Sequence, residues 1–150
     1  MYQIRQQQFI PTQLERCWDF FSNPVNLAKI TPADMGFKVL TPLPPRVYEG
    51  LMIHYEVRPL LGINTGWVTE IKTVKEPVFF VDEQRSGPYK IWHHEHFFES
   101  VDGGVMMTDI VSYKLPLGWL GKFAHFLFVK RKLEQVFSYR HKKVAELFAN

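Results

Sequence analysis

The chain has 150 residues, of which 46% are hydrophobic and 22% are charged, and it contains one cysteine. These values are typical of a single globular domain over residues 1–150, and they exclude an intrinsically disordered chain, a collagen-like repeat and a disulfide-rich scaffold. Aromatic residues make up 15% of the chain, with 13 Phe, six Tyr and four Trp, which is more ring volume than a core of this size usually contains.

The net charge of +3 is unevenly distributed along the chain. Residues 114–150 carry eight Lys and Arg but only two Asp and Glu, so this segment is strongly basic. Because these charges alternate with a regular apolar pattern, we interpret them as the solvated face of a helix. The sequence has no apolar signal-peptide core and no run of about 18 apolar residues, so we expect a cytoplasmic protein without a membrane span.

Two short helices are predicted near the N-terminus. Thr12 and Glu15 have the spacing of a capping box, which marks a helix start. The apolar face of this helix is formed, at spacings of three and four, by Leu14, Cys17, Trp18 and Phe21. The cysteine on this face is expected to be packed and unreactive. Asn23 is then expected as the N-cap of a second helix, with Pro24 at its first position and Pro32 just after its end.

From residue 36 to residue 115 the apolar period changes from 3.6 to two, which indicates strands. Turn-forming residues recur between them, at 42–45, 62–64, 76–77, 86–88 and 102–104. Together with an N-terminal strand, the predicted strands are 2–10, 36–40, 50–59, 65–75, 78–85, 89–99 and 105–115. Since the connections are too short for crossover helices, we expect a mostly antiparallel sheet.

A long helix is predicted from Gly118 to Phe148. Its apolar residues recur every three or four positions and are Phe126, Val129, Leu133, Val136, Phe137, Val144 and Leu147. A helix of about 30 residues is roughly 45 Å long, and only a curved sheet offers it a large enough surface. The predicted fold class is therefore α+β, with a curved seven-stranded sheet wrapped around a long C-terminal helix and two short helices after the first strand.

Alternation along the strands places a large set of polar residues on the face that meets this helix. They are Tyr55, Asp82, Gln84, His94, His96, Asp109 and Tyr113. A close-packed core would not accept them, because each buried polar group without a partner costs about 1–3 kcal/mol. We therefore expect a small-molecule cavity. Its predicted apolar walls are Trp67, Trp92, Phe98, Val111, Phe126, Val129 and Leu133.

Several of these segments carry a family resemblance. They are Trp18–Leu27 with Ile30-Thr31-Pro32, Phe80–Gln84, Gly87-Pro88-Tyr89, Trp92-x-His94-x-His96-x-Phe98, Met107-Thr108-Asp109 and Tyr113-x-Leu115-Pro116-x-Gly118. Over nearly its whole length the chain resembles the START-like (SRPBCC) superfamily, and within it the bacterial proteins described as polyketide cyclase/dehydrase-like or ligand-binding. The resemblance implies a helix-grip fold with a cavity between sheet and long helix. It also implies binding of lipids, sterols, polyketides or other apolar ligands, with enzymatic activity in only some members.

Three interpretations of His94 and His96 remain open. Their i, i+2 spacing places both imidazoles on one side of a strand, where Asp109 or Asp82 could complete a metal site. The other interpretations are a hydrogen-bond network with Asp109 and Tyr113, and direct contact with a ligand. We expect no metal and no cofactor.

Two features of the basic C-terminal segment also have more than one interpretation. Arg140 lies beside the apolar stripe, either paired with a carboxylate of the sheet or in contact with an anionic group of the ligand. Nucleic-acid binding is not expected, because the aromatic residues fall on inward faces. A peripheral membrane contact is an alternative in which Trp119, Leu120, Phe123 and Phe128 would act beside Lys122 and Lys130. Otherwise these residues are expected to cap the cavity and pack on the first two helices.

The sequence thus favours a carrier or sensor that binds a small, largely apolar molecule, such as a lipid, sterol or polyketide, between sheet and helix. The alternative is a cyclase-, dehydratase- or hydrolase-type enzyme. In that case His94 or His96 would act as a general base oriented by Asp109 or Asp82, and Tyr113 or Tyr55 would polarise a carbonyl. The identity of the ligand and the oligomeric state are left open by the sequence.

Overall fold

The structure, a computed structural model, describes residues 1–58 and 63–149. Within these ranges, seven strands form one antiparallel sheet in the order β1-β7-β6-β5-β4-β3-β2. They are β1 (Tyr2–Ile10), β2 (Lys38–Val39), β3 (Met52–Val57), β4 (Thr65–Lys75), β5 (Phe79–Ser86), β6 (Ile91–Val101) and β7 (Gly104–Lys114). The end of the strand predicted at 50–59 and the start of the turn predicted at 62–64 lie outside the described residues.

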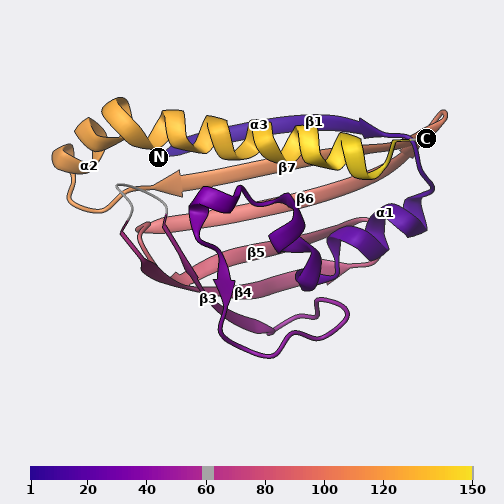
Figure 1. Ribbon diagram of the computed structural model, residues 1–150, viewed down its shortest axis with the longest axis horizontal. Coiled ribbons are helices and arrows are strands. Elements are labelled where there is room, and N and C mark those ends of the chain that lie inside the picture. Colours follow the sequence, from indigo (N-terminus) through magenta and orange to yellow (C-terminus); the bar gives the residue numbers. More distant parts are fainter. Residues whose placement is uncertain (59–62, 150) are drawn as a thin grey trace.

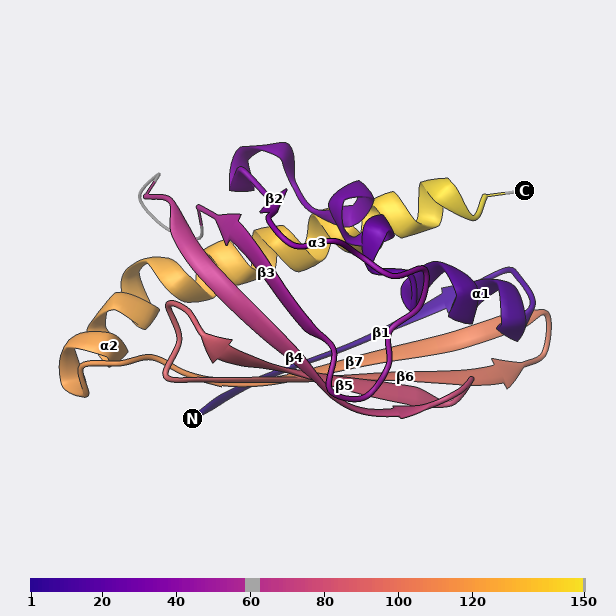
Figure 2. The same ribbon diagram turned by 90° about the horizontal axis from the view of Figure 1, so that it is seen from below.

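Helical segments cover one face of the sheet. Between β1 and β2 lie α1 (Leu14–Phe21) and the 3-10 helices η1 (Pro24–Ile30) and η2 (Ala33–Met35). After β7 the chain forms α2 (Trp119–Ala124), the π-helical turn η3 (His125–Val129) and α3 (Lys130–Leu147). Figure 1 shows α3 running along the sheet, and Figure 2 shows that the sheet curves so that β3 and β4 rise beside this helix. This is the predicted α+β helix-grip fold.

Helix α1 begins where the apolar pattern predicts, but without the predicted cap. Its N-cap is Gln13, whose side chain makes no capping hydrogen bond. Thr12 precedes the N-cap position by one residue, and its backbone N–H donates to the carbonyl of Ile10 at 2.9 Å in the turn before the helix. The capping-box prediction is therefore wrong. Asn23 caps η1 as predicted by accepting the Val25 N–H at 3.1 Å, although this helix is of the 3-10 type.

The strand faces follow the alternation of the sequence. On β6, His94, His96 and Phe98 are buried, and alternate residues of β7 are buried as predicted. The exception among the strands is the one predicted at 36–40, which is reduced to Lys38–Val39. Gly36 precedes it in the left-handed conformation, with φ 59°, and prolines, which cannot donate to a strand ladder, follow it.

The C-terminal helical segment differs from the single regular helix that was expected. Leu133, Phe137 and Val144 of α3 are buried as predicted, but Phe126 is 82% exposed and Leu147 is 43% exposed. The π-helical turn inserts extra chain into the helix and changes the phase of the residues before α3, Phe126 among them. Leu147 is the last residue of α3, at the end of the helix. The expectation that Phe126 and Leu147 face the sheet is wrong.

Two apolar clusters fix α3 on the sheet. One surrounds Trp18 of α1 and includes Val144 near the end of α3. The second joins Val111 of β7 to Leu133 and Phe137 of α3. Each fully buried large apolar side chain stabilises the fold by about 1.5–3 kcal/mol, so contacts at two points along α3 hold it at a set distance from the sheet. Among the residues that the structure describes, no helix has the length and hydrophobicity needed to cross a membrane.

Candidate functional site

A cavity of about 220 Å³ lies between the sheet, η1 and α3. Its aromatic lining consists of Phe20, Phe21, Phe37, Tyr55, Trp67, Phe80, Tyr89, Trp92 and Phe137. About half of the remaining lining is aliphatic, and the rest consists of polar side chains from the η1 segment, β4, β5, β6 and α3. A concave, mostly apolar pocket with a few polar groups has the usual composition of a small-molecule site, although its volume is below the roughly 300–1,000 Å³ of pockets for drug-sized ligands.

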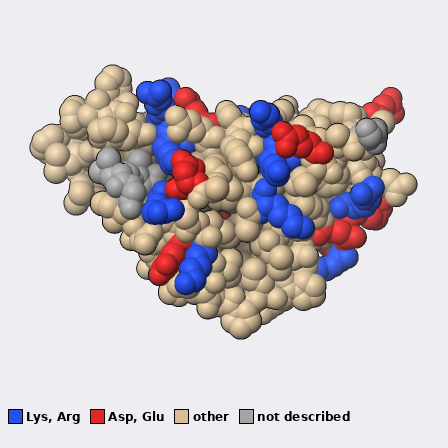
Figure 3. All heavy atoms as spheres, viewed as in Figure 1, with Lys and Arg blue, Asp and Glu red and all other residues tan. Residues whose placement is uncertain are grey.

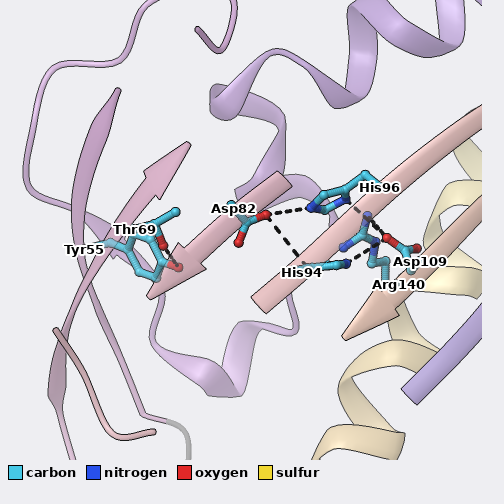
Figure 4. A network of polar contacts seen from close by, with 7 residues as sticks. All are labelled: Tyr55, Thr69, Asp82, His94, His96, Asp109 and Arg140. Carbon is cyan, nitrogen blue, oxygen red and sulfur yellow. Dashed lines mark hydrogen bonds and ion pairs between the residues drawn. The ribbon is translucent and has the colours of Figure 1, made fainter. Parts of the chain in front are cut away.

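The polar side of the cavity is built by the register of three strands. Asp82 of β5 lies opposite His94 of β6, and Asp109 of β7 lies opposite His96. Residues two positions apart on a strand share a face, so all four side chains meet on the inner surface of the sheet. Arg140 of α3 reaches the same group, and Figure 4 shows the two imidazoles between the two aspartates. We call these five residues the polar cluster.

Within the polar cluster each histidine bonds to the aspartate diagonal to it. His94 Nε2 lies 2.9 Å from Asp109 Oδ1, and His96 Nε2 lies 2.6 Å from Asp82 Oδ2. His96 Nδ1 is 3.2 Å from Asp109 Oδ1, a close electrostatic contact that lacks hydrogen-bond alignment. Arg140 Nη2 donates to the same Asp109 oxygen at 3.4 Å. Asp109 is therefore the centre of the cluster, although it does not itself line the cavity.

These contacts shift the pKa values of the cluster in different directions. Burial lowers the pKa of His94, and the neighbouring His96 lowers it further. Burial also opposes a charged His96, but its contacts with Asp109 and Asp82 outweigh that effect and raise its pKa. Burial would raise the pKa of both carboxyls, yet Arg140 and the histidines hold that of Asp109 well below its usual value, and His96 lowers that of Asp82. These shifts favour the ionised form of both carboxyls and the protonated form of His96, whose positive charge would join that of Arg140 beside them.

Asp82, His94 and His96 form a group, among the described residues, whose donor atoms all lie within 4.8 Å of one another and could hold a metal ion. The two imidazole rings are stacked, with centroids 3.7 Å apart and planes inclined by 28°. The lone pair of an imidazole nitrogen lies in the plane of its ring, so two nearly parallel rings cannot both point at one ion without turning. The geometry therefore favours the hydrogen-bond network over a metal site.

A second polar region lies on β3 and β4. The hydroxyls of Tyr55 and Thr69 are 3.0 Å apart and hydrogen-bonded. Trp67 stacks on Tyr55 with ring centroids 5.9 Å apart, and its buried Nε1 has no hydrogen-bond partner among the described residues. Because an indole N–H is only a donor and an unsatisfied buried donor costs about 1–3 kcal/mol, Trp67 would gain from a ligand acceptor atom that reached Nε1.

The structure brings about half of the predicted site residues together. Those that line the cavity are Tyr55, Trp67, Asp82, Trp92, His94, His96, Leu133 and Arg140. Four others are buried but do not line it, namely Phe98, Asp109, Val111 and Val129. These four residues instead support the cavity wall by packing or, for Asp109, by holding the histidines, and any ligand role for them stays a prediction.

Three predicted cavity positions are wrong. Gln84 instead holds the β5–β6 turn, because its Nε2 donates to the carbonyl of Tyr89 at 2.6 Å and its Oε1 accepts the Tyr89 N–H at 3.0 Å. The Tyr113 hydroxyl lies 2.7 Å from Nε2 of His125, outside the polar cluster. Phe126 faces solvent. The predicted network of His94 and His96 therefore includes Asp109 but not Tyr113.

Arg140 combines features of both interpretations made from the sequence. Its guanidinium is paired with Asp109, and it also lines the cavity and lies 5.7 Å above the ring of Phe21. Its Nε is buried and has no hydrogen-bond partner within residues 1–58 and 63–149. The pairing with a carboxylate of the sheet is confirmed, whereas contact with an anionic ligand stays a prediction.

The residues that sequence reasoning missed come mainly from the segment around η1. They are Phe20, Phe21, Asn23, Pro24, Asn26, Leu27, Ile30 and Thr31, with Phe37 and Tyr89 from other connections. A short 3-10 helix has no long periodic pattern that would assign its faces. Phe137 also lines the cavity, and its place in the predicted apolar stripe of the long helix could have identified it as a lining residue.

No protein-family model matches the chain, and no curated protein sequence matches it. Solved structures do resemble it. CV1439 from Chromobacterium violaceum has 15% identity and a TM-score of 0.74, over 100% of this chain and 99% of that one. Major latex-like protein 151 from Panax ginseng has 12% identity and a TM-score of 0.70, over 99% and 98%. Ara h 8.0201 has 12% identity and a TM-score of 0.65, over 98% and 97%.

At these identities the likeness establishes the fold alone. The architecture is a helix-grip fold with a cavity between the sheet and α3. The START-like superfamily and the bacterial subfamily expected from the sequence stay predictions.

Proposed function

We propose that the protein binds a small, largely apolar molecule between the sheet and α3, as a carrier or sensor. The observation that carries this proposal is the cavity of about 220 Å³, walled mainly by aromatic and aliphatic side chains. Burial of apolar ligand surface would supply most of the affinity, at about 25 cal/mol per Å² before the costs of ordering are subtracted. The solved structures of similar fold are consistent with this function at the level of the fold.

The two polar regions of the cavity support a particular kind of ligand. Both carboxyls of the polar cluster already have partners in the histidines and Arg140, so the cluster offers no unpaired carboxylate to a charged ligand. Trp67 Nε1, in contrast, is a buried donor without a partner among the described residues. A molecule with an apolar body and one acceptor oxygen, such as a ketone, ester or alcohol, matches this arrangement. Among lipids, sterols and polyketides, the volume favours a short-chain lipid or a small polyketide over an intact sterol.

Native mass spectrometry of the freshly purified protein tests the proposal. We expect a co-purifying organic mass in the wild type and its loss in Val136→Trp, because Val136 lines the cavity and an indole would fill it. Gln135→Trp is the matched control, since Gln135 is exposed on the same helix and its variant should retain the mass. A wild type that carries no molecule and binds no fatty acid, sterol, flavonoid or aromatic ketone would contradict the proposal.

One observation supports the enzyme alternative as a second candidate. His94 lines the cavity, its pKa is lowered by burial, and its Nε2 is engaged by Asp109. Its Nδ1, 4.0 Å from Asp82 Oδ2, is then available as a base. In a cyclase or dehydratase, His94→Gln would abolish turnover of the co-purifying molecule while the molecule stays bound. If His94→Gln instead reduces only binding, His94 is a ligand contact and the enzyme alternative fails.

A further inference from the structure

The turns that precede α3 expose a large apolar surface. Its members, here called the α2 apolar face, are Leu117, Trp119, Leu120, Phe123, Phe126 and Phe128, with exposed fractions from 49% to 82%. Figure 3 shows the end of the molecule at α2 as uncharged surface on the face displayed. Contiguous apolar surface of this kind is rare on a protein without a partner and marks an interaction site.

The exposure of this face is enforced by what the same turns bury. Gly121 is buried, and a Cβ at this position would lie 2.2 Å from the carbonyl oxygen of Pro116. His125 stacks on Tyr2 with ring centroids 3.5 Å apart. Val129 is 1% exposed. These anchors follow one another at intervals of four and hold one side of the helix against the sheet, so the aromatic side chains cannot turn inward without breaking these contacts.

The exposed aromatic residues have the spacing of an interfacial helix. Trp119, Phe123 and Phe126 follow one another at i, i+4 and i+7, which places them on one helical face. Trp and Phe on a helix beside Lys are typical of helices that lie in the plane of a membrane surface.

The charge around the α2 apolar face favours an anionic partner. Lys114, Lys122, Lys130 and Arg131 are exposed, and the sequence from Lys114 to Leu133 contains no Asp or Glu. A second copy of this chain would bring the same positive charges to the contact. An anionic bilayer would instead attract these residues, by about 1 kcal/mol for each Lys or Arg near its surface.

We propose that the α2 apolar face docks peripherally on an anionic lipid bilayer. Trp119, Phe123 and Phe126 would enter the headgroup region, and Lys122 and Lys130 would contact the anionic headgroups. The proposal does not depend on the ligand in the cavity. Because η3 continues directly into α3, docking would bring the beginning of the helix that walls the cavity to the membrane surface.

Sedimentation with large unilamellar vesicles tests the proposal. The wild type should bind vesicles of phosphatidylcholine and phosphatidylglycerol in equal amounts, and should bind pure phosphatidylcholine much more weakly. High salt should reduce the binding. Trp119→Ala with Phe126→Ala should weaken it at least about tenfold through lost apolar burial. Lys122→Glu with Lys130→Glu should also weaken it at least about tenfold through lost attraction.

Matched controls use exposed residues elsewhere on the molecule. Val25 and Tyr48 are 51% and 55% exposed, and Val25→Ala with Tyr48→Ala should leave vesicle binding unchanged. Lys29→Glu with Lys75→Glu makes the same change in net charge on exposed residues and should reduce binding less than the Lys122 and Lys130 pair. Circular dichroism would check that every variant is folded.

Two results would overturn the proposal. One is the absence of vesicle binding, or of its loss: either the wild type does not bind anionic vesicles, or the variant with Trp119→Ala and Phe126→Ala binds them as well as the wild type does. The other is a wild-type dimer in light scattering that Trp119→Ala with Phe126→Ala converts to a monomer, without vesicle binding by either protein. The α2 apolar face would then be a self-association surface.

Discussion

Helix α3 buries Leu133, Phe137 and Val144 and exposes charged residues, whereas the turns before it bury Gly121, His125 and Val129 and expose aromatic side chains. The two halves belong to one continuous helical segment and are both basic. They differ in what anchors them: apolar packing and the polar cluster hold α3, while a close glycine contact and an imidazole hold α2 and η3. The comparison teaches that the anchoring residues, and not the apolar residues alone, decide which face of a helix is buried.

Matched phenylalanine substitutions give the largest expected difference between the two halves. Phe137 is 4% exposed, so Phe137→Ala should lower the free energy of unfolding by about 3–5 kcal/mol. Phe126 is 82% exposed, so Phe126→Ala should change it by no more than about 0.5 kcal/mol. Urea denaturation measures both values. Equal losses would show that the two halves are not packed differently.

Two arginines provide the next comparison. Arg140 donates to buried Asp109, and Arg140→Gln should cost about 1.5–3 kcal/mol because a charged hydrogen bond is lost. Arg131 is exposed near the start of α3, and Arg131→Gln should change stability by no more than about 0.5 kcal/mol. The same denaturation measurement applies. If Arg140→Gln left the free energy of unfolding unchanged, the polar cluster would not depend on its contact with α3.

Gly121→Ala tests whether Gly121 anchors α2 against Pro116, because the sign of its effect on the free energy of unfolding depends on this contact. In a free helix this change stabilises by about 1 kcal/mol. Here the new Cβ would meet the carbonyl oxygen of Pro116, and such overpacking costs about 1–3 kcal/mol. We expect a net loss of about 1 kcal/mol and weaker hydrogen-exchange protection in residues 119–129. Lys122→Ala, at an exposed neighbour, is the control. A stabilised Gly121→Ala variant would show that these turns are not held against Pro116.

The pH dependence of stability should differ between the buried histidines of the two regions. The raised pKa of His96 means that the folded state keeps a proton that the unfolded state loses above about pH 6.5, so stability falls as the pH rises through the raised value. Burial and Lys130 lower the pKa of His125, so stability instead falls as the pH drops below about 6.5, and the lowered pKa of His94 contributes to the same acid limb.

For each histidine the slope is at most about 1.4 kcal/mol per pH unit, the limit for one proton. His96→Gln should flatten the alkaline limb, and His125→Gln should reduce the acid limb, to which His94 also contributes, in denaturation series from pH 5 to 9. His54→Gln, at an exposed position on β3, is the control and should leave both limbs as they are in the wild type. If the alkaline limb persists in His96→Gln, or the acid limb keeps its full slope in His125→Gln, groups other than that histidine cause the limb.

The sequence predicts the fold well because long alternating strands and a long apolar stripe leave few alternatives. On β6 the period of two is sufficient to place His94 and His96 inside. Their partners are less accessible, because the diagonal bonds to Asp82 and Asp109 depend on the register of β5, β6 and β7, which joins residues distant in the sequence. Alternation along one strand carries no information on this register.

The errors concentrate where regular periodicity ends. The π-helical turn changes the helical phase, so the stripe that is correct for Leu133 and Phe137 is wrong for Phe126. The 3-10 helix η1 contributes to the cavity without any repeating pattern. The expectation that Trp119 and its neighbours cap the cavity is also wrong, since they are exposed.

The indole N–H signals in a two-dimensional NMR spectrum test the central claim, a ligand cavity at Trp67, most directly. Trp67 lines the cavity, and its buried Nε1 has no partner in the described part of the chain, whereas Trp119 is 74% exposed on the α2 apolar face. On titration with small aromatic ketones such as propiophenone, the Trp67 signal, assigned with Trp67→Phe, should shift and saturate while the Trp119 signal stays in place. A Trp67 signal that does not move while that of Trp119 does would place binding on the exposed face and contradict the account.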